Sequence, residues 1–263
     1  MSNRNTYPTP YPDVNAILDR LLANVQAILT DRLVGMYLYG SLANGGFDPG
    51  SSDIDFLIVT DDELPGEIVT ALVEMHTQIA TLNTRWATEL EGSYIPKDAL
   101  RRHDPARAQH PHIDRGSGHL SIMQHDSDWV VQRYILRERG IVLTGPPLPA
   151  LIDPVSPDDL RQAVRTLMRM WWGPMLSNPA PLQHGGYRSY AILTMCRVLY
   201  TLRHGGIVSK TQAGQWAQVA LGEQWRTLIG RAMEHRNGTP LIAVDDALAF
   251  IGYAVGQSVQ EDL

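Results

Sequence analysis

The stretch YGSLANGGFDPGSSDIDFLIVT (residues 39–60) decides the fold of this 263-residue chain. Its second part, 53–60, is an apolar run opened by Asp-Ile-Asp, and it predicts a buried strand. Successive side chains of a strand point to opposite faces, so Asp53 and Asp55 share one face while Ile54 and Phe56 enter the core. Two carboxylates on one face are unfavourable unless a cation neutralises them. Mg²⁺ commonly takes one or two carboxylates plus substrate phosphates, so the pattern predicts a magnesium site.

A glycine-serine pair precedes this strand, at the end of another strand predicted over 33–40. Gly40 allows close backbone approach, and Ser41 supplies a hydroxyl and an N–H group, so together they can hold the terminal phosphates of a nucleotide. Ser52, beside the first aspartate, is assigned to the same nucleotide-binding set. Taken alone, the pair is better explained by a tight turn. Its combination with the Gly-rich loop over 41–52 and the two aspartates favours a nucleotide site.

A third acid is expected on the strand predicted over 85–96, RWATELEGSYIP. Glu89 and Glu91 are two residues apart and would lie on one face of this strand, beside the strand of the two aspartates. Phosphoryl-type transfer needs a base that takes the proton of the acceptor hydroxyl, and a carboxylate near the metal can do so. Either glutamate alone could equally be a solvated acid at a sheet edge. The residues predict that one of the two is the base and leave open which.

The rest of the first half alternates helical and extended patterns. Asp13 is the predicted N-cap of an amphipathic helix, and Ser127 is the predicted N-cap of a helix that ends at Gly140. The predicted elements are a helix over 14–29, a helix over 65–82, a loop over 97–118, a helix over 128–139 and a short strand over 141–145.

The Pro-rich segment 145–154 marks a domain boundary. Ser156 as a cap, Pro157 at the first helical position and acids in the first turn open a helical region. Its predicted helices cover 157–172, 187–203, 210–220, 223–236 and 243–260. The chain is therefore predicted to be an α+β protein: a domain over 1–150 with a mixed sheet flanked by helices, then an all-helical bundle over 151–263.

The composition is that of a folded protein with an acidic balance. Hydrophobic residues make up 44% of the chain and charged residues 19%, and the formal net charge is −6. Binding to nucleic acid rests on clustered Lys and Arg, so we expect no nucleic-acid partner and a small cationic substrate instead. The first residues lack a basic-then-apolar signal-peptide pattern and no apolar run is long enough to span a bilayer, so we expect a cytoplasmic protein without membrane contact. We expect a monomer or a weak oligomer.

Cysteine, histidine and tryptophan give weaker signals. Cys196, the only cysteine, lies at helical spacing among apolar residues, which predicts a core thiol rather than a nucleophile. Four histidines are close in sequence: His110, His112, His119 and His125. Without a nearby cysteine, they are expected to form polar surface or to contact the acceptor rather than to bind zinc. Four tryptophans fall at helical spacing that favours core packing over a role in a sugar-binding cleft: Trp171, Trp172, Trp216 and Trp225.

These residues resemble the nucleotidyltransferase superfamily pattern of Gly-Ser, then Asp-x-Asp, then a later acid. More narrowly, both halves of the chain are similar to the aminoglycoside adenylyltransferases that modify streptomycin and spectinomycin. The N-terminal likeness rests on YGSLANGGFDPGSSDIDFLIVT and on DWVVQRYILRERGIVLTGP leading into LIDPV. The C-terminal likeness rests on ILTMCRVLYTLRHGGIVSKTQAGQWA, which is similar to that family's Arg-bearing helix followed by a Ser-Lys motif and Trp-Ala.

The resemblance implies a role for each matching residue. Ser41 would bind phosphate, Asp53 and Asp55 would bind Mg²⁺, and Glu91 would be the base and a further metal ligand. The helical domain would contribute to binding ATP and the acceptor. The implied activity is Mg²⁺-dependent transfer of AMP from ATP to a hydroxyl of a small aminoglycoside or aminocyclitol, with release of pyrophosphate.

The resemblance also implies two cations for the ATP phosphates, Arg197 and Lys210. For Lys210 the residues give independent support. Ser209 and Gln212 form a predicted capping box, which puts Lys210 in the first turn of a helix, where a cation opposes the macrodipole. An anion bound nearby would explain that placement, and a solvated surface lysine is the alternative.

Departures from the family fall on the acceptor side. Streptomycin-modifying members carry an acid shortly before the Arg-bearing helix, where this chain reads QHGGYR (183–188), and a Trp downstream of the base, where HPHIDRGSGHLS (110–121) has none. Two alternatives therefore stay open. One is the same adenylyl transfer to another metabolite or to a protein side chain, and the other is a catalytically silent nucleotide-binding regulator.

Overall fold

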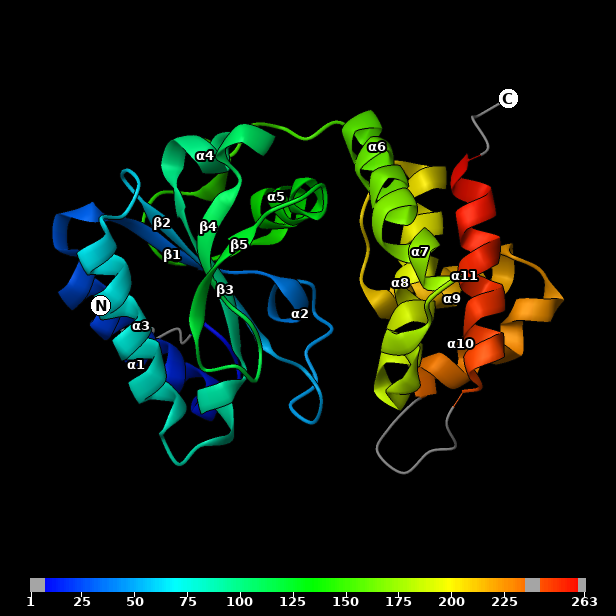
Figure 1. Ribbon diagram of the computed structural model, residues 1–263, viewed down its shortest axis with the longest axis horizontal. Helices are drawn as coiled ribbons and strands as arrows, with labels where there is room; N and C mark the ends of the chain where they lie inside the picture. The colour runs from blue at the N-terminus through cyan, green and yellow to red at the C-terminus, as the bar shows by residue number, and fades with distance from the viewer. Residues whose placement is uncertain (1–7, 235–241, 260–263) are drawn as a thin grey trace, which may run out of the picture. The chain divides into compact units, whose positions relative to one another are not determined.

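The computed structural model describes residues 8–234 and 242–259. Its internal contacts divide the chain into a first unit that ends at Pro154 and a second unit that begins at Val155. The first unit contains a six-stranded mixed sheet with helices, and the second is helical over its described residues (Figure 1). The predicted fold class is confirmed. Within the described ranges, none of the helices combines the length and the apolar character needed to cross a bilayer.

The sheet of the first unit has the strand order β5-β4-β3-β2-β1-β6. Its strands are β1 (Leu33–Leu38), β2 (Ile54–Thr60), β3 (Leu90–Pro96), β4 (Gln109–Ile113), β5 (Leu120–Gln124) and β6 (Ile141–Thr144). β2 and β3 run parallel, and every other neighbouring pair is antiparallel. β2, the strand of the aspartates, therefore lies beside β3, the strand that carries Glu91, as predicted.

Helices pack on both faces of this sheet (Figure 1). They are α1 (Pro12–Leu29), α2 (Gly40–Ala43), α3 (Gly66–Ala80), α4 (Lys97–Arg101) and α5 (Asp128–Arg139). On one face, α1 and α3 bury an apolar core that includes Leu18, Phe56 and Tyr94. On the other face, Trp129 of α5 lies against Tyr39, with ring centroids 6.4 Å apart. The alternation of β2 puts its aspartates on the α5 face, because Phe56 belongs to the α1 and α3 core.

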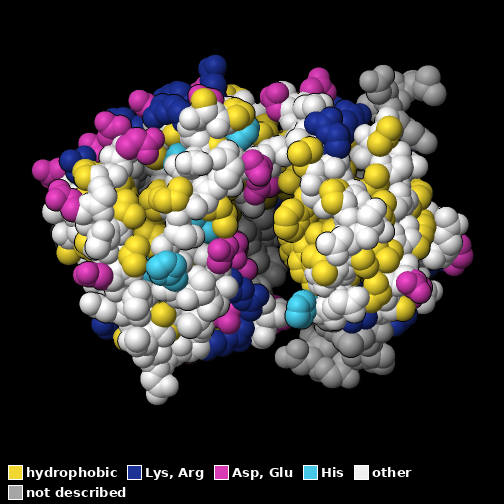
Figure 2. Space-filling view, viewed as in Figure 1, with side chains coloured by type: hydrophobic (Ala, Val, Ile, Leu, Met, Phe, Trp, Pro, Cys, Tyr) yellow, Lys and Arg dark blue, Asp and Glu magenta, His cyan; other side chains and the backbone are white. Residues whose placement is uncertain are grey.

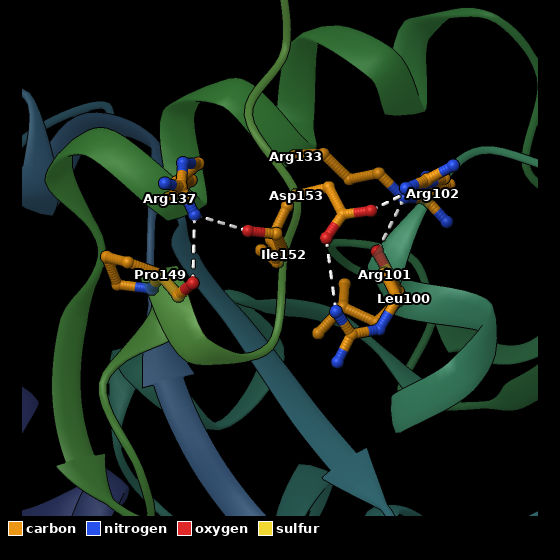
Figure 3. A network of polar contacts seen from close by, with 8 residues as sticks. All are labelled: Leu100, Arg101, Arg102, Arg133, Arg137, Pro149, Ile152 and Asp153. Atoms are coloured by element: carbon orange, nitrogen blue, oxygen red, sulfur yellow. Dashed lines mark hydrogen bonds and ion pairs between the residues drawn. The ribbon is translucent and has the colours of Figure 1, made fainter.

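Arginines at the end of α4 and in α5 bind residues 149–153, the segment that precedes the second unit (Figure 3). Arg101 bonds the Asp153 carboxylate at 3.1 Å, and Arg102 pairs with the same carboxylate. The guanidinium of Arg137 donates to the carbonyl of Pro149 at 3.0 Å and to that of Ile152. These contacts tie the chain to the first unit as far as the residue before the boundary proline.

The second unit contains the predicted helices with adjusted ends. They are α6 (Pro157–Leu167), a π-helical stretch (Met168–Trp172), α7 (Gly173–Met175), α8 (Gly185–His204), α9 (Lys210–Ala220), α10 (Glu223–Glu234) and α11 (Val244–Val259). Ser156 caps α6, and the capping box of Ser209 and Gln212 is formed, so these two predictions are confirmed. Cys196 is fully buried, and burial raises its thiol pKa to about 12, which confirms the core thiol. The predicted ends at 235–236 and 260 lie outside the described residues.

The tryptophans of the second unit behave differently from one another. Trp172 is buried, as predicted, whereas Trp171 is 56% exposed, so the prediction of core packing is wrong for Trp171. The π-helical stretch widens the turn at this point and changes the direction of the side chains. Other large apolar side chains are exposed nearby in the sequence, and Figure 2 shows hydrophobic side chains over the visible face of this unit.

Three predicted boundaries of the first unit are wrong, and one that the sequence marks with Ser127 is right. The segment 97–118 is not a continuous loop, because it contains α4 and β4, whose polar and proline residues hid the strand. Pro12 begins α1, so Asp13 lies in the first turn instead of at the cap. The boundaries predicted for α5 are confirmed: Ser127 is its N-cap, although the serine side chain makes no cap hydrogen bond, and the helix ends before Gly140. The start of the strand predicted over 85–96 is a 3₁₀ turn, Arg85–Thr88.

Three of the four clustered histidines are buried, so the prediction of polar surface is wrong for His110, His112 and His125. His125 stacks on Trp129 with ring centroids 3.7 Å apart, and Ser93 Oγ lies 2.7 Å from His112 Nδ1 and 3.1 Å from His125 Nε2. Burial lowers the pKa of all three rings. The three rings are neutral packing groups, and those of His112 and His125 also lie within hydrogen-bond distance of the Ser93 hydroxyl.

Candidate active site

The parallel pairing of β2 and β3 brings two acids side by side. Asp53 directly precedes β2, and Asp55 is its second residue. Both are half-buried, whereas the side chain of Ile54 between them is fully buried, as the alternation predicts. The register sets Asp55 directly opposite Glu91 of β3. Neighbouring strands lie about 4.8 Å apart, so the two carboxylates start from adjacent points on one sheet face.

Gly40 fits against the Asp55 carboxylate, where no side chain can stand. Its φ of +60° lies in the left-handed region, and a Cβ at this position would be 1.7 Å from Asp55 Oδ2. The backbone N–H of Tyr39 donates to the Asp55 carbonyl at 3.1 Å, which holds the end of β1 on the aspartate strand. The glycine is therefore required twice, for its backbone angle and for the space that the carboxylate fills.

The serines of the loop have different surroundings. Ser41 Oγ, in the short helix α2, is buried and makes no hydrogen bond within the part of the chain that the structure describes. Ser52 Oγ accepts the N–H of Asp48 at 3.0 Å, and the Ser52 N–H donates to the Asp48 carbonyl at 2.8 Å. Ser52 therefore shapes the loop one residue before Asp53, while the Ser41 hydroxyl is oriented by no protein group of the described chain and suits a ligand oxygen.

The two glutamates, which the sequence could not separate, occupy different positions. Glu91 lies within β3, while Glu89 lies before the strand begins, so the prediction that both share a strand face is wrong for Glu89. The Glu89 carboxylate forms an ion pair with Arg115 at 2.6 Å. The base is therefore better sought in Glu91.

Electrostatics favour Glu91 as a proton acceptor. Burial, helped by the charges of Asp53 and Asp114, raises the pKa of Glu91 to about 7, against the opposing effect of Arg115. Burial and the charges of Asp55, Glu91 and Asp53 also raise the pKa of Tyr39 well above its usual value. A carboxyl group that titrates near neutral pH is suited to accept a proton from a hydroxyl.

The two aspartates suit a magnesium ion that takes its remaining ligands from a substrate and from water. Within residues 8–234 and 242–259, no group of three or more His, Cys, Asp or Glu side chains has an arrangement able to hold a metal. Mg²⁺ needs only one or two carboxylates when phosphate oxygens and water complete its shell. Asp53 and Asp55 offer that pair, and the Asp55 carboxylate occupies the space that a side chain at position 40 would fill.

The two predicted cations lie in the second unit. Arg197 is a half-buried residue of α8, and Lys210 is the first residue of α9. Lys210 Nζ lies 4.1 Å from the ring centroid of Tyr190, a cation–π contact. Tyr190 and Arg197 are seven residues apart and so project from nearly the same face of α8. Sequence reasoning missed Tyr190, whose only signal was this spacing, and it missed Arg115, for which no motif exists.

Comparisons with known proteins agree with this geometry. Residues 18–101 match the family model of the nucleotidyltransferase domain, and residues 150–255 match the model of the aminoglycoside adenylyltransferase C-terminal domain. With the paired acids on a mixed sheet, these matches define the chain as a nucleotidyltransferase. More narrowly, both halves of the chain are similar to aminoglycoside adenylyltransferases, and the predicted resemblance is confirmed.

Individual relatives cover most of the chain. An aminoglycoside (3'') (9) adenylyltransferase of Shigella flexneri is 26% identical over 231 residues, which are 84% of this chain and 85% of the relative. A spectinomycin 9-adenylyltransferase of Staphylococcus aureus is 27% identical over 222 residues, 81% and 82% of the two chains. The crystal structure of spectinomycin adenyltransferase AAD(9) from Enterococcus faecialis with ATP and spectinomycin has the same fold, with a TM-score of 0.75 and 18% identity over 93% of this chain and 99% of that one.

Proposed function

We propose that this enzyme transfers AMP from ATP to a hydroxyl of a small aminoglycoside or aminocyclitol and releases pyrophosphate. The observation that carries the proposal is the register that pairs Asp55 with Glu91 on one face of the sheet, with Gly40 packed against the Asp55 carboxylate. A metal-binding acid beside an acid of raised pKa is what hydroxyl activation next to a triphosphate needs.

Each residue has a defined task in this reaction. Glu91 accepts the proton of the acceptor hydroxyl, and the acceptor oxygen then attacks the α-phosphorus in line with the departing pyrophosphate. Ser41 donates its hydroxyl to a phosphate oxygen, and Gly40 keeps the Asp55 carboxylate in place. Asp53 and Asp55, with Glu91 as a further ligand, would hold Mg²⁺, which supplies neutralisation of the phosphate charge when bound.

Arg197 and Lys210 are proposed to neutralise the charge of the ATP phosphates from the second unit. The cation–π contact with Tyr190 supports this role for Lys210, because it restricts a long side chain that would otherwise lose more entropy on binding. The capping box places Lys210 in the first turn of α9, where its charge opposes the helix dipole unless an anion is near.

The acceptor is proposed to be cationic. The named relatives act on aminoglycosides or spectinomycin. Several acids surround the Asp55 and Glu91 pair in the first unit, since Asp53, Asp114 and Asp128 all influence the pKa of Glu91 or Tyr39. Such a negative field attracts amino-substituted sugars and disfavours anionic metabolites.

Pyrophosphate release tests the proposal. The purified protein is incubated with ATP and Mg²⁺ and with streptomycin, spectinomycin or other aminoglycosides, and Asp53→Asn is the control. Release that depends on one drug and is lost in the control supports the proposal. Release that depends on another metabolite or on a protein acceptor would move the activity to that substrate. ATP binding without release for any acceptor would indicate the catalytically silent regulator.

A further inference from the structure

The turn that carries Ser41 lies beside the end of α5, because one strand pair of the sheet leads to both. β1 and β6 pair antiparallel, with Leu38 opposite Ile141. Continuing this register past the end of the pairing brings Gly40, where α2 begins, to the level of Arg139, the last residue of α5. Two segments that lie far apart in the sequence therefore meet at the same end of the sheet.

A side-chain hydrogen bond joins these two segments across 95 residues of sequence. Arg139 Nη1 donates to Asn44 Oδ1 at 3.0 Å. Asn44 is the C-cap of α2, and its backbone N–H donates to the Gly40 carbonyl at 3.1 Å, which closes the turn. Both partners are half-buried and the donor is charged, so this hydrogen bond is stronger than one between exposed neutral groups. The end of α5 is thus bonded to the end of α2.

The turn is closed on itself, so a bond that fixes Asn44 also restricts Ser41. The N–H of Gly46 donates to the Ser41 carbonyl at 3.1 Å, which adds a second bond to the one that closes α2. Gly45 and Gly46 are exposed, and a Cβ built on either would meet no atom of the described residues within 4 Å, so they give the turn no packing support. The Ser41 hydroxyl, which no described protein group orients, takes its direction from the backbone of this turn.

We propose that the hydrogen bond between Arg139 and Asn44 positions Ser41 for binding the terminal phosphates of ATP. The inference rests on the proposed function of Ser41 as a phosphate ligand. Arg139 and Asn44 are positioning residues, because they act through the backbone of α2. A hydroxyl binds a phosphate oxygen only within hydrogen-bond reach, so a turn that is no longer bonded to α5 binds the nucleotide more weakly, while the acids of β2 and β3 stay in place.

The binding test compares Asn44→Ala and Arg139→Ala with Arg107→Ala as the matched control. Arg107 forms a surface ion pair with Glu63 at 3.7 Å, and both side chains are well exposed. Each of the first two variants should raise the Kd and the KM for ATP with Mg²⁺ about fivefold with little change in kcat, because one hydrogen bond is lost while the base is intact. Both changes remove the same contact, so the double variant should bind no more weakly than either single one. Arg139→Lys should recover part of the affinity, because an ammonium group can also donate to the Asn44 side chain.

Asn44→Ala separates positioning from simple charge attraction. This variant keeps the positive charge of Arg139, and Asn44 has a φ of −92°, which alanine adopts without strain. An unchanged Kd in Asn44→Ala together with a raised Kd in Arg139→Ala would mean that the guanidinium attracts the phosphates by its charge alone. That result would overturn the inference, and so would an unchanged Kd in both variants.

A second readout depends on neither ATP nor turnover. The amide protons of residues 40–46 should exchange with deuterium faster in Asn44→Ala and in Arg139→Ala than in the wild-type protein, as followed by mass spectrometry, because the turn opens more often. Those of residues 54–60 in β2 should keep their exchange rates. Unchanged exchange of residues 40–46 in both variants refutes the positioning role. A wild-type protein that binds no ATP would instead refute the proposed function, and the exchange rates would still decide whether the pair holds the turn.

Discussion

Replacing Gly40 with alanine should remove activity while the first unit stays folded. The new Cβ would lie 1.7 Å from Asp55 Oδ2 and 2.3 Å from its carboxyl carbon, whereas ordinary contact begins at 3.4 Å. The carboxylate must therefore withdraw by roughly 1.7 Å, and misplacement of a catalytic group by about 1 Å can cost about 100-fold in rate. The left-handed backbone adds a cost of about 1–2 kcal/mol to the free energy of folding.

Gly45→Ala is the matched control for this experiment. Gly45 has φ +69°, so alanine meets the same backbone cost, but its Cβ has no atom within 4 Å. Urea unfolding should give both variants a similar loss of stability, and pyrophosphate release should fall about 100-fold in Gly40→Ala alone. Equal activity of the two variants would refute the assignment of Gly40 as the residue that makes room for the Asp55 carboxylate.

Three further predictions concern stability and reactivity. Gly92→Ala should destabilise the first unit by about 1–3 kcal/mol in urea unfolding, because its Cβ would lie 2.3 Å from the Phe56 carbonyl oxygen; a smaller change would mean that β2 and β3 can separate locally. Burial lowers the pKa of His76 to about 4, so the unfolded chain binds a proton at this residue more readily than the native protein does. The free energy of unfolding is therefore highest above pH 6.5 and falls as the pH drops from 6.5 towards 4, by up to about 1.4 kcal/mol per pH unit. His76→Gln should flatten the decline of the urea midpoint between pH 7 and 5, and an unaltered slope would contradict this. Cys196 should resist thiol reagents in the native protein and react in urea, whereas rapid native labelling would show that α8 is not packed as described.

The sequence was sufficient for the fold class and for the main elements around the aspartates. The alternation from Asp53 to Phe56 and the long helical period of α1 are local patterns, so they predict these elements without information from distant parts of the chain. β4 was missed because His110 and His112 are polar in sequence but buried and neutral in the fold. His112 contacts Ser93 of β3, and the ring of His110 lies 4.9 Å from that of His125, which stacks on Trp129 of α5. These partners come from other elements, and no local pattern reports such contacts.

The candidate site was predictable as a set of residue types and not as a geometry. Glu89 and Glu91 are equivalent by spacing, and the start of β3 between them separates their surroundings. The choice follows from the β2 and β3 register and from the ion pair to Arg115, both of which join distant segments. The role of Gly40 likewise appears only when the end of β1 is packed beside Asp55.

The most direct test of the central claim is the mass of the acceptor after incubation with enzyme, ATP and Mg²⁺. The account predicts that an aminoglycoside or spectinomycin gains one adenylyl group, that this product is absent with Asp53→Asn, and that it is absent with Glu91→Ala. A gain of a phosphoryl group instead, an unmodified drug in the presence of full ATP turnover, or a product that forms equally well with Glu91→Ala would contradict it.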